Sequence, residues 1–355
     1  MHGMMKWAVA RAVVMGLVLV VAPLVLAAPD PLPLWRDGSP AKAALVDYVN
    51  AVVGQTADTI PPEERIAVFD FDGTLFCETA PTYFDWMLYE HRVLDDPSFK
   101  ATAEQLSLAR DSRERGILPG LTSARERIVA EAYRGLTLAE FDAYVRAFMA
   151  EPQPGFTCLK RGEAFYRPMV EVVKYLLANR FAVYVCSGTD RLIMRPVVEK
   201  ELALPPSRVL GSDSTIVARD QDGRDGLEYV CGTNCVLVLG GKSVVKNLQM
   251  NKVSLIEKEI GVRPVLAFGN SMTDASMLNW TLGNPRRRAL AFMLLCDDTT
   301  REYGNLKKAA KMREACETHG WIPVSMRDDW STIYGDSVKK DESSASWLKR
   351  KTIPD

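Results

Sequence analysis

The chain has 355 residues, of which 47% are hydrophobic and 25% are charged, and its formal net charge is −1. These values describe an ordinary globular protein with enough chain for one large or two modest domains. Basic residues are interspersed with acidic ones, so the composition gives no indication of a nucleic-acid partner or a membrane-surface partner. Only His91 and His319 follow residue 28. A mechanism that needs several histidines is therefore disfavoured.

The N-terminus has the pattern of a secretory signal peptide. Lys6 and Arg11 precede an apolar run over residues 12–28, which ends in small residues and is followed by a proline-rich stretch. We expect residues 1–28 to be a leader that is removed, and the protein to be periplasmic or secreted in a bacterium. An uncleaved membrane anchor is the alternative, because the run reaches the lower length limit of a spanning helix. No other stretch is apolar enough to span a bilayer, so no stable membrane insertion is expected once the leader is removed.

Residues 65–75 form the motif around which we expect the rest to be organised. The apolar run Ile66–Phe69 suits a buried parallel strand, and Gly73 ends it, so that Asp70 and Asp72 lie at the carboxyl edge of a sheet. Open α/β sheets bind ligands at that edge. One carboxylate there can attack phosphorus, and a second can act as general acid and base. A strand that simply ends in an Asp-Gly turn is the alternative interpretation.

A second buried strand is predicted over residues 181–186. It is followed by Ser187-Gly188-Thr189 and then by a helix over residues 191–199. Alone, Ser-Gly-Thr is a turn that carries a hydroxyl group. Between a strand and a helix N-terminus, it predicts a cradle for a phosphate group.

A third strand is predicted over residues 265–268, with Asn270 and Asp274 just beyond it. Two oxygen-bearing side chains at this spacing suit one hard cation such as Mg²⁺, although a capped helix start is the alternative. A helix over residues 252–261 precedes this strand and begins with Lys252. The three strand ends and this lysine together supply a nucleophile, an acid/base, a phosphate donor, a counter-charge and metal ligands.

The spacing of these motifs predicts the domain organisation. The core is expected over residues 29–80 and 165–335, and a mainly helical insert over residues 81–164 is expected to form a cap that acts as a lid. A helical subdomain without contact to substrate is the alternative. Residues 336–355 are expected to be a flexible tail.

Seven cysteines in an exported chain make at least one disulfide plausible. Cys231 and Cys235 can close a small loop. Cys77 and Cys186 lie beside the predicted strands and are interpreted as small buried apolar residues rather than catalytic groups.

In these motifs the chain resembles the haloacid dehalogenase superfamily, and within it an exported bacterial branch related to phosphoserine phosphatase. The resemblance covers roughly residues 32–333. Beyond the three strand-end motifs it rests on further short segments: Leu32–Trp35, Glu64–Asp70, Arg263-Pro264, Gly320–Met326 and Asp329-Trp330.

The resemblance implies a fold and a set of roles. The fold is a doubly wound, mostly parallel α/β sheet with a helical cap inserted after the first strand. The implied catalytic residues and their roles are Asp70 as nucleophile, Asp72 as general acid/base, Ser187 as phosphoryl-binding hydroxyl and Lys252 as the partner of the phosphoryl oxygens. The implied substrate-binding residues are Thr74, Glu78, Ser187, Gly188 and Lys252. The implied Mg²⁺ site comprises Asp70, Asp72 through its carbonyl group, Asn270 and Asp274.

Three points remain open when the roles of the family's residues are assigned to this chain. The commoner fourth motif has Asp where this chain has Asn270, and Met272 replaces an acid expected in the branch. Lys242 and Lys246 compete with Lys252, which the spacing to Asn270 favours. Glu78 has a role in amine recognition by resemblance, with a surface helix-capping acid as the alternative.

The predicted function is an exported, Mg²⁺-dependent phosphomonoesterase that acts on a small phosphorylated metabolite through an aspartyl-phosphate. Asp72 argues against a dehalogenase, because a halide leaving group needs no acid. A phosphotransferase that uses an alcohol acceptor and a non-catalytic phosphate-binding protein on the same fold are the alternatives.

Overall fold

The structure of the protein is a computed structural model that describes residues 30–78, 81–116 and 123–349. The predicted leader lies outside the described residues, as do residues 350–355. Within the described part of the chain, no helix combines the length and the apolar character needed to cross a membrane.

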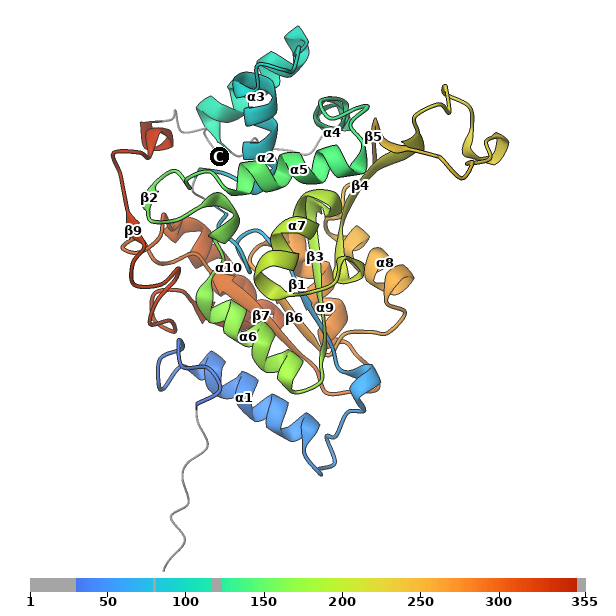
Figure 1. Ribbon diagram of the computed structural model, residues 1–355. Helices are drawn as coiled ribbons and strands as arrows, with labels where there is room; N and C mark the ends of the chain where they lie inside the picture. Colours follow the sequence, from blue (N-terminus) through green and yellow to red (C-terminus); the bar gives the residue numbers. More distant parts are fainter. Residues whose placement is uncertain (1–29, 79–80, 117–122, 350–355) are drawn as a thin grey trace, which may run out of the picture. The chain divides into compact units, whose positions relative to one another are not determined.

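A seven-stranded sheet forms the centre of the core (Figure 1). Its strands are β1 (Ile66–Phe69), β3 (Ala182–Asp190), β4 (Val209–Ala218), β5 (Leu237–Val245), β6 (Leu266–Gly269), β7 (Leu290–Leu295) and β8 (Ile322–Ser325). The strand order is β5-β4-β3-β1-β6-β7-β8, and every pair is parallel except β4 with β5. The predicted mostly parallel sheet is therefore confirmed, and β1 has the predicted bounds.

Alternate residues of the sheet face two hydrophobic layers, as expected from the two-residue period of a strand. Ala67 and Phe69 of β1 belong to the layer formed with α1, α6 and α7, whereas Ile66 and Val68 belong to the layer formed with α8, α9 and α10. These helices are α1 (Pro40–Val53), α6 (Arg167–Ala178), α7 (Arg191–Leu202), α8 (Met250–Glu259), α9 (Ala275–Leu282) and α10 (Leu306–His319). Helices on both faces explain why β1 is buried at all four positions.

The insert between β1 and β3 contains the cap helices, which lie beyond the β1 and β3 end of the sheet in Figure 1. They are α2 (Phe84–Glu90) with a π-helical turn at His91–Asp95, α3 (Ala103–Arg115), α4 (Ser123–Glu131) and α5 (Leu138–Met149). Thr137 and Glu140 form a capping box at the start of α5.

Residues 336–349 differ from the flexible tail expected from the sequence. Residues Lys339–Lys340 form β9, which pairs antiparallel with β2 (Phe156–Thr157) at the end of the insert. The ring of Trp347 also packs against Tyr303, with ring centroids 5.2 Å apart. The described part of the C-terminal segment is therefore held to the insert by backbone pairing and to the core by aromatic packing.

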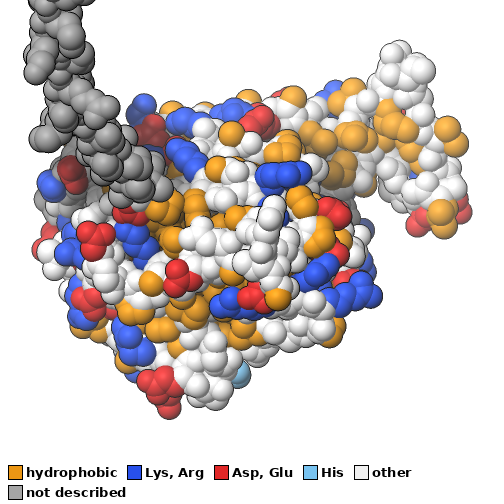
Figure 2. All heavy atoms as spheres, turned by 90° about the horizontal axis from the view of Figure 1, so that it is seen from below, with side chains coloured by type: hydrophobic (Ala, Val, Ile, Leu, Met, Phe, Trp, Pro, Cys, Tyr) orange, Lys and Arg blue, Asp and Glu red, His pale blue; other side chains and the backbone are white. Residues whose placement is uncertain are grey.

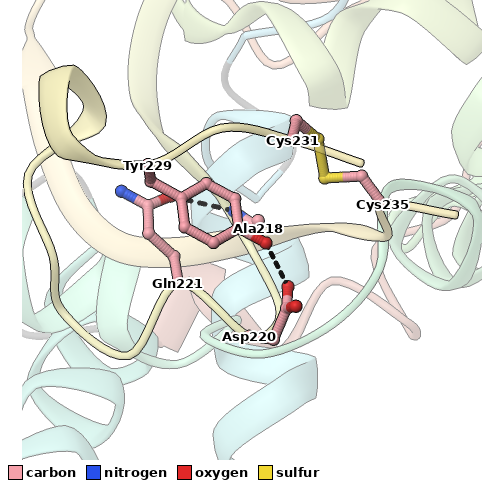
Figure 3. The surroundings of a disulfide bond; sticks show 6 residues. All are labelled: Ala218, Asp220, Gln221, Tyr229, Cys231 and Cys235. Carbon is pink, nitrogen blue, oxygen red and sulfur yellow. Dashed lines mark hydrogen bonds between the residues drawn. A yellow bond between two sulfur atoms is a disulfide. The ribbon is translucent and has the colours of Figure 1, made fainter. Parts of the chain in front are cut away.

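The antiparallel pair β4–β5 extends beyond the rest of the sheet and carries a loop that projects from the core (Figures 1 and 2). Backbone hydrogen bonds between Leu239 and both Gly135 and Leu136 join β5 to the segment between α4 and α5. Within the loop, Cys231 and Cys235 form the disulfide that the sequence suggests, and the hydroxyl of Tyr229 donates to Asp220 (Figure 3). On the face drawn in Figure 2, positive and negative side chains are interspersed.

Candidate active site

The carboxyl ends of β1, β3 and β6 meet because β1 lies between the other two strands in the sheet. Asp70 follows β1, Ser187 lies in β3 and Asn270 follows β6. A cavity of about 350 Å³ opens at this edge. It is lined by Asp70, Asp72, Glu78, Tyr83, Asp85, Trp86, Arg125, Glu126, Ser187, Gly188, Thr189, Lys246, Leu248, Asn270, Ser271 and Thr273. The structure thus brings the residues of the predicted motifs to one place.

Asp70 is held between the sheet and a buried lysine. Its backbone N–H donates to Phe268 of β6, and its Oδ1 accepts a hydrogen bond of 2.5 Å from Lys252 Nζ. Burial and the charge of Asp274 raise the pKa of Asp70 to about 6, while Lys252 opposes this rise. Asp70 is therefore a carboxylate at neutral pH, with one oxygen fixed by an ammonium group.

Lys252 is fully buried and also donates to Asp274 Oδ1 at 2.6 Å. Burial opposes its charge, but Asp274 and Asp70 together outweigh burial and raise the pKa of Lys252. It lies in the first turn of α8, whose start is tied to the loop that carries Asp274 by a bond from Gln249 N–H to the Thr273 carbonyl. Gln249 adopts a φ of +53°, which is strained for a residue other than glycine. The competing lysine, Lys246, lies elsewhere in the cavity wall.

Asp72 has a different environment, although it lies only two residues from Asp70. Its Oδ2 accepts a hydrogen bond of 2.7 Å from the Thr189 hydroxyl, and its Oδ1 is buried with no hydrogen-bond partner among the described residues. Burial, followed by the charge of Asp85, raises the pKa of Asp72 well above its usual range. This environment favours the protonated form of Asp72, which is the form that can donate a proton.

Ser187 is buried within β3, and its hydroxyl accepts a hydrogen bond from Thr189 N–H. Gly188 lies against Leu248, since an added Cβ would come within 2.6 Å of that side chain. The predicted strand ends at residue 186, before these residues, whereas the observed strand includes them. Strand β3 continues to Asp190, and the Asp190 side chain caps α7 by accepting from Leu192 N–H.

Two other residues that the resemblance assigned to substrate binding lie beside Asp70. The Thr74 hydroxyl donates to Asp70 Oδ2 at 3.4 Å. Glu78 is buried in the cavity wall, where both of its oxygens accept from Lys308 Nζ at 2.7 Å and one also accepts from the Tyr83 hydroxyl. Its charge is thus matched by Lys308. Glu78 is therefore not a surface residue that caps a helix. Its carboxylate is already paired with the ammonium group of Lys308.

The predicted metal ligands differ in how far their oxygens are already engaged. Asp274 accepts from Lys252 through Oδ1, and from the N–H groups of Asn270 and Ser271 through Oδ2. Both Asp274 oxygens are thus already engaged in hydrogen bonds, so Asp274 holds neighbouring groups in place rather than serving as a direct metal ligand. Asn270 is buried, and its side-chain nitrogen has no partner among the described residues. Because amide nitrogen and oxygen are assigned from hydrogen bonding, the Asn270 amide can equally present its oxygen there.

Asn270 also packs directly on the loop that follows Asp72. A Cβ at Gly73 would lie 1.8 Å from the Asn270 amide, and Gly73 has a φ of +82°, so that only glycine fits there. The Asp70 carboxylate, the Asp72 carbonyl and the Asn270 amide are oxygen ligands of the kind that Mg²⁺ prefers. Among the described residues, no group of three or more His, Cys, Asp or Glu side chains is placed to hold a metal ion. The donor set therefore fits a Mg²⁺ ion held by one carboxylate and two neutral oxygens.

Sequence reasoning missed several cavity residues and considered Lys246 only as a competitor of Lys252. Lys246, at the end of β5, lies 3.9 Å from Asp85 of α2 and 3.6 Å from Glu126 of α4. Tyr83, Trp86 and other cap residues complete the wall. They carry no motif, and only the packing of the insert brings them together. Their position favours the prediction of a lid over that of a remote subdomain.

Comparisons with known proteins point to one family. The sequence profile of the haloacid dehalogenase-like hydrolases matches residues 67–279, which include every residue of the predicted site. No curated protein matches the chain.

Among solved structures, a conserved protein of unknown function from Anaerococcus prevotii is 14% identical, with a TM-score of 0.50, and the match covers 80% of this chain and 91% of that one. A protein of unknown function from Bordetella pertussis is 15% identical over 74% and 98% of the two chains, with a TM-score of 0.48. Cytosolic 5'-nucleotidase IIIB bound to cytidine is 16% identical over 82% and 87%, with a TM-score of 0.48. At these identities the likeness concerns the fold.

Proposed function

The chain belongs to the haloacid dehalogenase-like hydrolase family, and from this premise we propose that it is a Mg²⁺-dependent phosphomonoesterase that works through an aspartyl-phosphate. The observation that carries the proposal is the contrast between two neighbouring carboxyl groups. Asp70 is paired with Lys252, whereas Asp72 lines the same cavity and has one buried oxygen with no hydrogen-bond partner among the described residues. Such a pair supplies a nucleophile and a proton donor at the same pH.

In the first half-reaction, an oxygen of Asp70 attacks phosphorus and the bond to the alcohol breaks. Asp72 gives its proton to the leaving alkoxide, so that the alcohol departs neutral. In the second half-reaction, Asp72 takes a proton from water, which attacks phosphorus and frees Asp70. Lys252 remains bonded to Asp70 and Asp274, so its charge is fixed in place before the substrate arrives.

Asp70, the Asp72 carbonyl and Asn270 are the groups that would hold Mg²⁺. The ion would offset repulsion between the phosphate dianion and the carboxylates and would polarise the phosphoryl oxygens. Ser187 and the backbone of Gly188 line the same end of the cavity and are the groups proposed to contact the phosphoryl group.

Phosphate release from a panel of phosphomonoesters, with and without Mg²⁺, tests the proposal. We expect Mg²⁺-dependent release that falls by several powers of ten in Asp70→Asn, which keeps the shape of the side chain but removes its charge. Activity in this variant within tenfold of the natural protein would refute the assignment of Asp70. Adding an alcohol acceptor and measuring both products separates hydrolysis from phosphotransfer.

Export is part of the same proposal. The leader pattern of residues 1–28 supports it, and so does the disulfide between Cys231 and Cys235, because disulfides persist in oxidising compartments. N-terminal sequencing of protein recovered from cells should find a start near Ala28 or Pro29. A start at Met1 would contradict cleavage of the leader.

A further inference from the structure

Two carboxylates that line the cavity are paired with lysines that lie behind its wall. The groups proposed to contact the phosphate and its metal ion form the phosphoryl end of the cavity, namely Asp70, Asp72, Ser187 and Asn270. Cap residues and the segment that follows β5 form the opposite wall. Lys252, the first of the two lysines, bonds to Asp70. The second is Lys308 of the core helix α10, which bonds to Glu78 and has no part in the mechanism given above.

The carboxyl group of Glu78 lies beside the phosphoryl end. A Cβ at Gly73 would come within 1.8 Å of the Asn270 amide nitrogen and within 3.1 Å of the Glu78 carboxyl carbon, so these two groups are neighbours at the Gly73 backbone. Glu78 is 3% exposed. Burial is the main cause of the raised pKa of Asp72, and the charge of Glu78 adds to it. An unpaired negative charge on Glu78 would therefore also act on a phosphate bound at this end.

Lys308 is placed to cancel that charge. Its Nζ donates to both Glu78 oxygens at 2.7 Å. Its backbone N–H donates to the side chain of Asn305, the N-cap of α10, and the next residue, Ala309, is buried, so the helix fixes the base of the lysine side chain. Burial opposes the charge of Lys308, but Glu78 outweighs burial and raises the pKa of Lys308. The ammonium group is therefore charged at neutral pH and is held against Glu78.

The other hydrogen-bond donor to Glu78 cannot replace the lysine. The Tyr83 hydroxyl donates to Glu78 Oε1 at 3.3 Å. Burial, followed by the charge of Glu78, raises the pKa of Tyr83 well above its usual range, so the hydroxyl stays neutral. A neutral hydroxyl stabilises a carboxylate without cancelling its charge. Among the described residues, the cation that pairs with Glu78 is Lys308.

We propose that Lys308 is a positioning residue of the phosphoryl end, because it holds Glu78 as an ion pair and so allows a phosphate dianion to bind beside a buried carboxylate. The inference rests on the proposed phosphomonoesterase activity and adds a residue that acts through Glu78 without touching the substrate. Charges repel one another over several ångströms where little water lies between them. Without its lysine, Glu78 would therefore weaken phosphate binding even though the two groups need not touch.

Binding of inorganic phosphate tests this role without requiring turnover. Its dissociation constant is measured by isothermal titration calorimetry at saturating Mg²⁺ for the natural protein, Lys308→Met, Glu78→Gln and the double variant. Lys308→Met has a side chain of similar length without charge, and it should raise the constant by about 10- to 100-fold because Glu78 loses its partner. Adding Glu78→Gln should bring the constant back to within about threefold of the natural value, because replacing both partners leaves no buried charge unpaired.

A conservative variant and a matched control separate this role from a general effect of charge. Lys308→Arg keeps a cation that can bond to both carboxylate oxygens, and it should bind phosphate within about threefold of the natural protein. Lys311→Met removes the same charge from an exposed position in α10 and should change nothing. With a phosphomonoester as substrate, Lys308→Met should raise KM and leave kcat nearly unchanged, because the repulsion acts on the bound substrate and on the transition state alike.

The outcomes distinguish this inference from the proposed activity. Unchanged phosphate binding in Lys308→Met, or a loss that Glu78→Gln does not restore, would overturn the inference. Weaker binding in Glu78→Gln alone would also overturn it, because the charge of Glu78 would then serve the ligand. If Lys308→Met does not fold, the double variant decides, since it should fold and bind phosphate, and failure to do so overturns the inference. Phosphate binding that follows the predicted order, without hydrolysis of any ester, would refute the phosphomonoesterase and leave the role of Lys308 standing.

Discussion

Two lysines face the cavity region in very different ways. Lys252 is fully buried and bonded at 2.5 and 2.6 Å to Asp70 and Asp274, all three of which come from the core. Lys246 is partly exposed and lies 3.6 and 3.9 Å from two carboxylates that belong to the cap. The first arrangement is fixed before substrate binds, as charge stabilisation in catalysis requires. The second links the segment after β5 to two cap helices through longer ion pairs.

The largest effect on stability is expected at the fixed lysine. Lys252→Met would leave two buried carboxylates facing each other without a cation, and breaking such a pair costs about 3–5 kcal/mol of unfolding free energy. Urea unfolding followed by tryptophan fluorescence measures the loss. It should shrink at acidic pH, where Asp70 becomes protonated. A loss below 1 kcal/mol at neutral pH would show that the three groups are not locked together.

A buried carboxyl group outside the cavity shows what burial does without a bonded lysine. Glu302 is held by the Tyr334 hydroxyl and the Tyr303 N–H, and burial raises its pKa from 4.5 to about 7. The folded state therefore binds more protons than the unfolded state between these pH values. The unfolding free energy should fall by about 3 kcal/mol as pH rises from 4.5 to 7, and then level off.

Glu302→Gln should remove this part of the pH dependence, because the amide does not titrate. Comparing the two stability curves between pH 4 and pH 8 isolates the contribution of Glu302 from those of other acids. Parallel curves would mean that Glu302 is ionised in the folded protein throughout, and that burial alone does not set its charge.

The metal site is expected to respond more moderately. Asn270→Asp adds a charge to a proposed ligand and should lower the Mg²⁺ concentration needed for half-maximal activity. Asp274→Ala removes the group that holds the Asn270 and Ser271 N–H groups, and should raise that concentration by about 10- to 100-fold. Magnesium titration of both variants tests this pair of expectations. Unchanged curves in both would place the ion elsewhere.

The smallest effect is expected at the second lysine. Lys246→Met should lower the unfolding free energy by less than Lys252→Met does, because the ion pairs of Lys246 are longer than those of Lys252. The same urea experiment serves as the matched comparison with Lys252→Met. Equal losses for both variants would remove the distinction between the two lysines.

Sequence reasoning predicts the phosphoryl end of the cavity and misses most of the opposite wall, for a physical reason. Asp70, Ser187 and Asn270 each follow or end a run of buried strand residues, and parallel strands place such ends at one edge. Asp85 and Glu126 reach the cavity, and Lys308 reaches Glu78 in its wall, through the packing of separate helices, which no local pattern encodes. The pairing of β2 with β9 was missed for the same reason, since two-residue strands far apart in sequence have no periodicity to detect.

The central claim is that Asp70 becomes phosphorylated during turnover. Protein quenched during hydrolysis of an ester and reduced with borohydride should contain homoserine at position 70, because an acyl phosphate is reduced whereas a free carboxylate is not. Peptide mass spectrometry locates the change, and Asp70→Asn treated in the same way is the control. Homoserine at residue 70 alone is the predicted result. Robust turnover without reduction at that residue, or with reduction at another acid, would contradict the account.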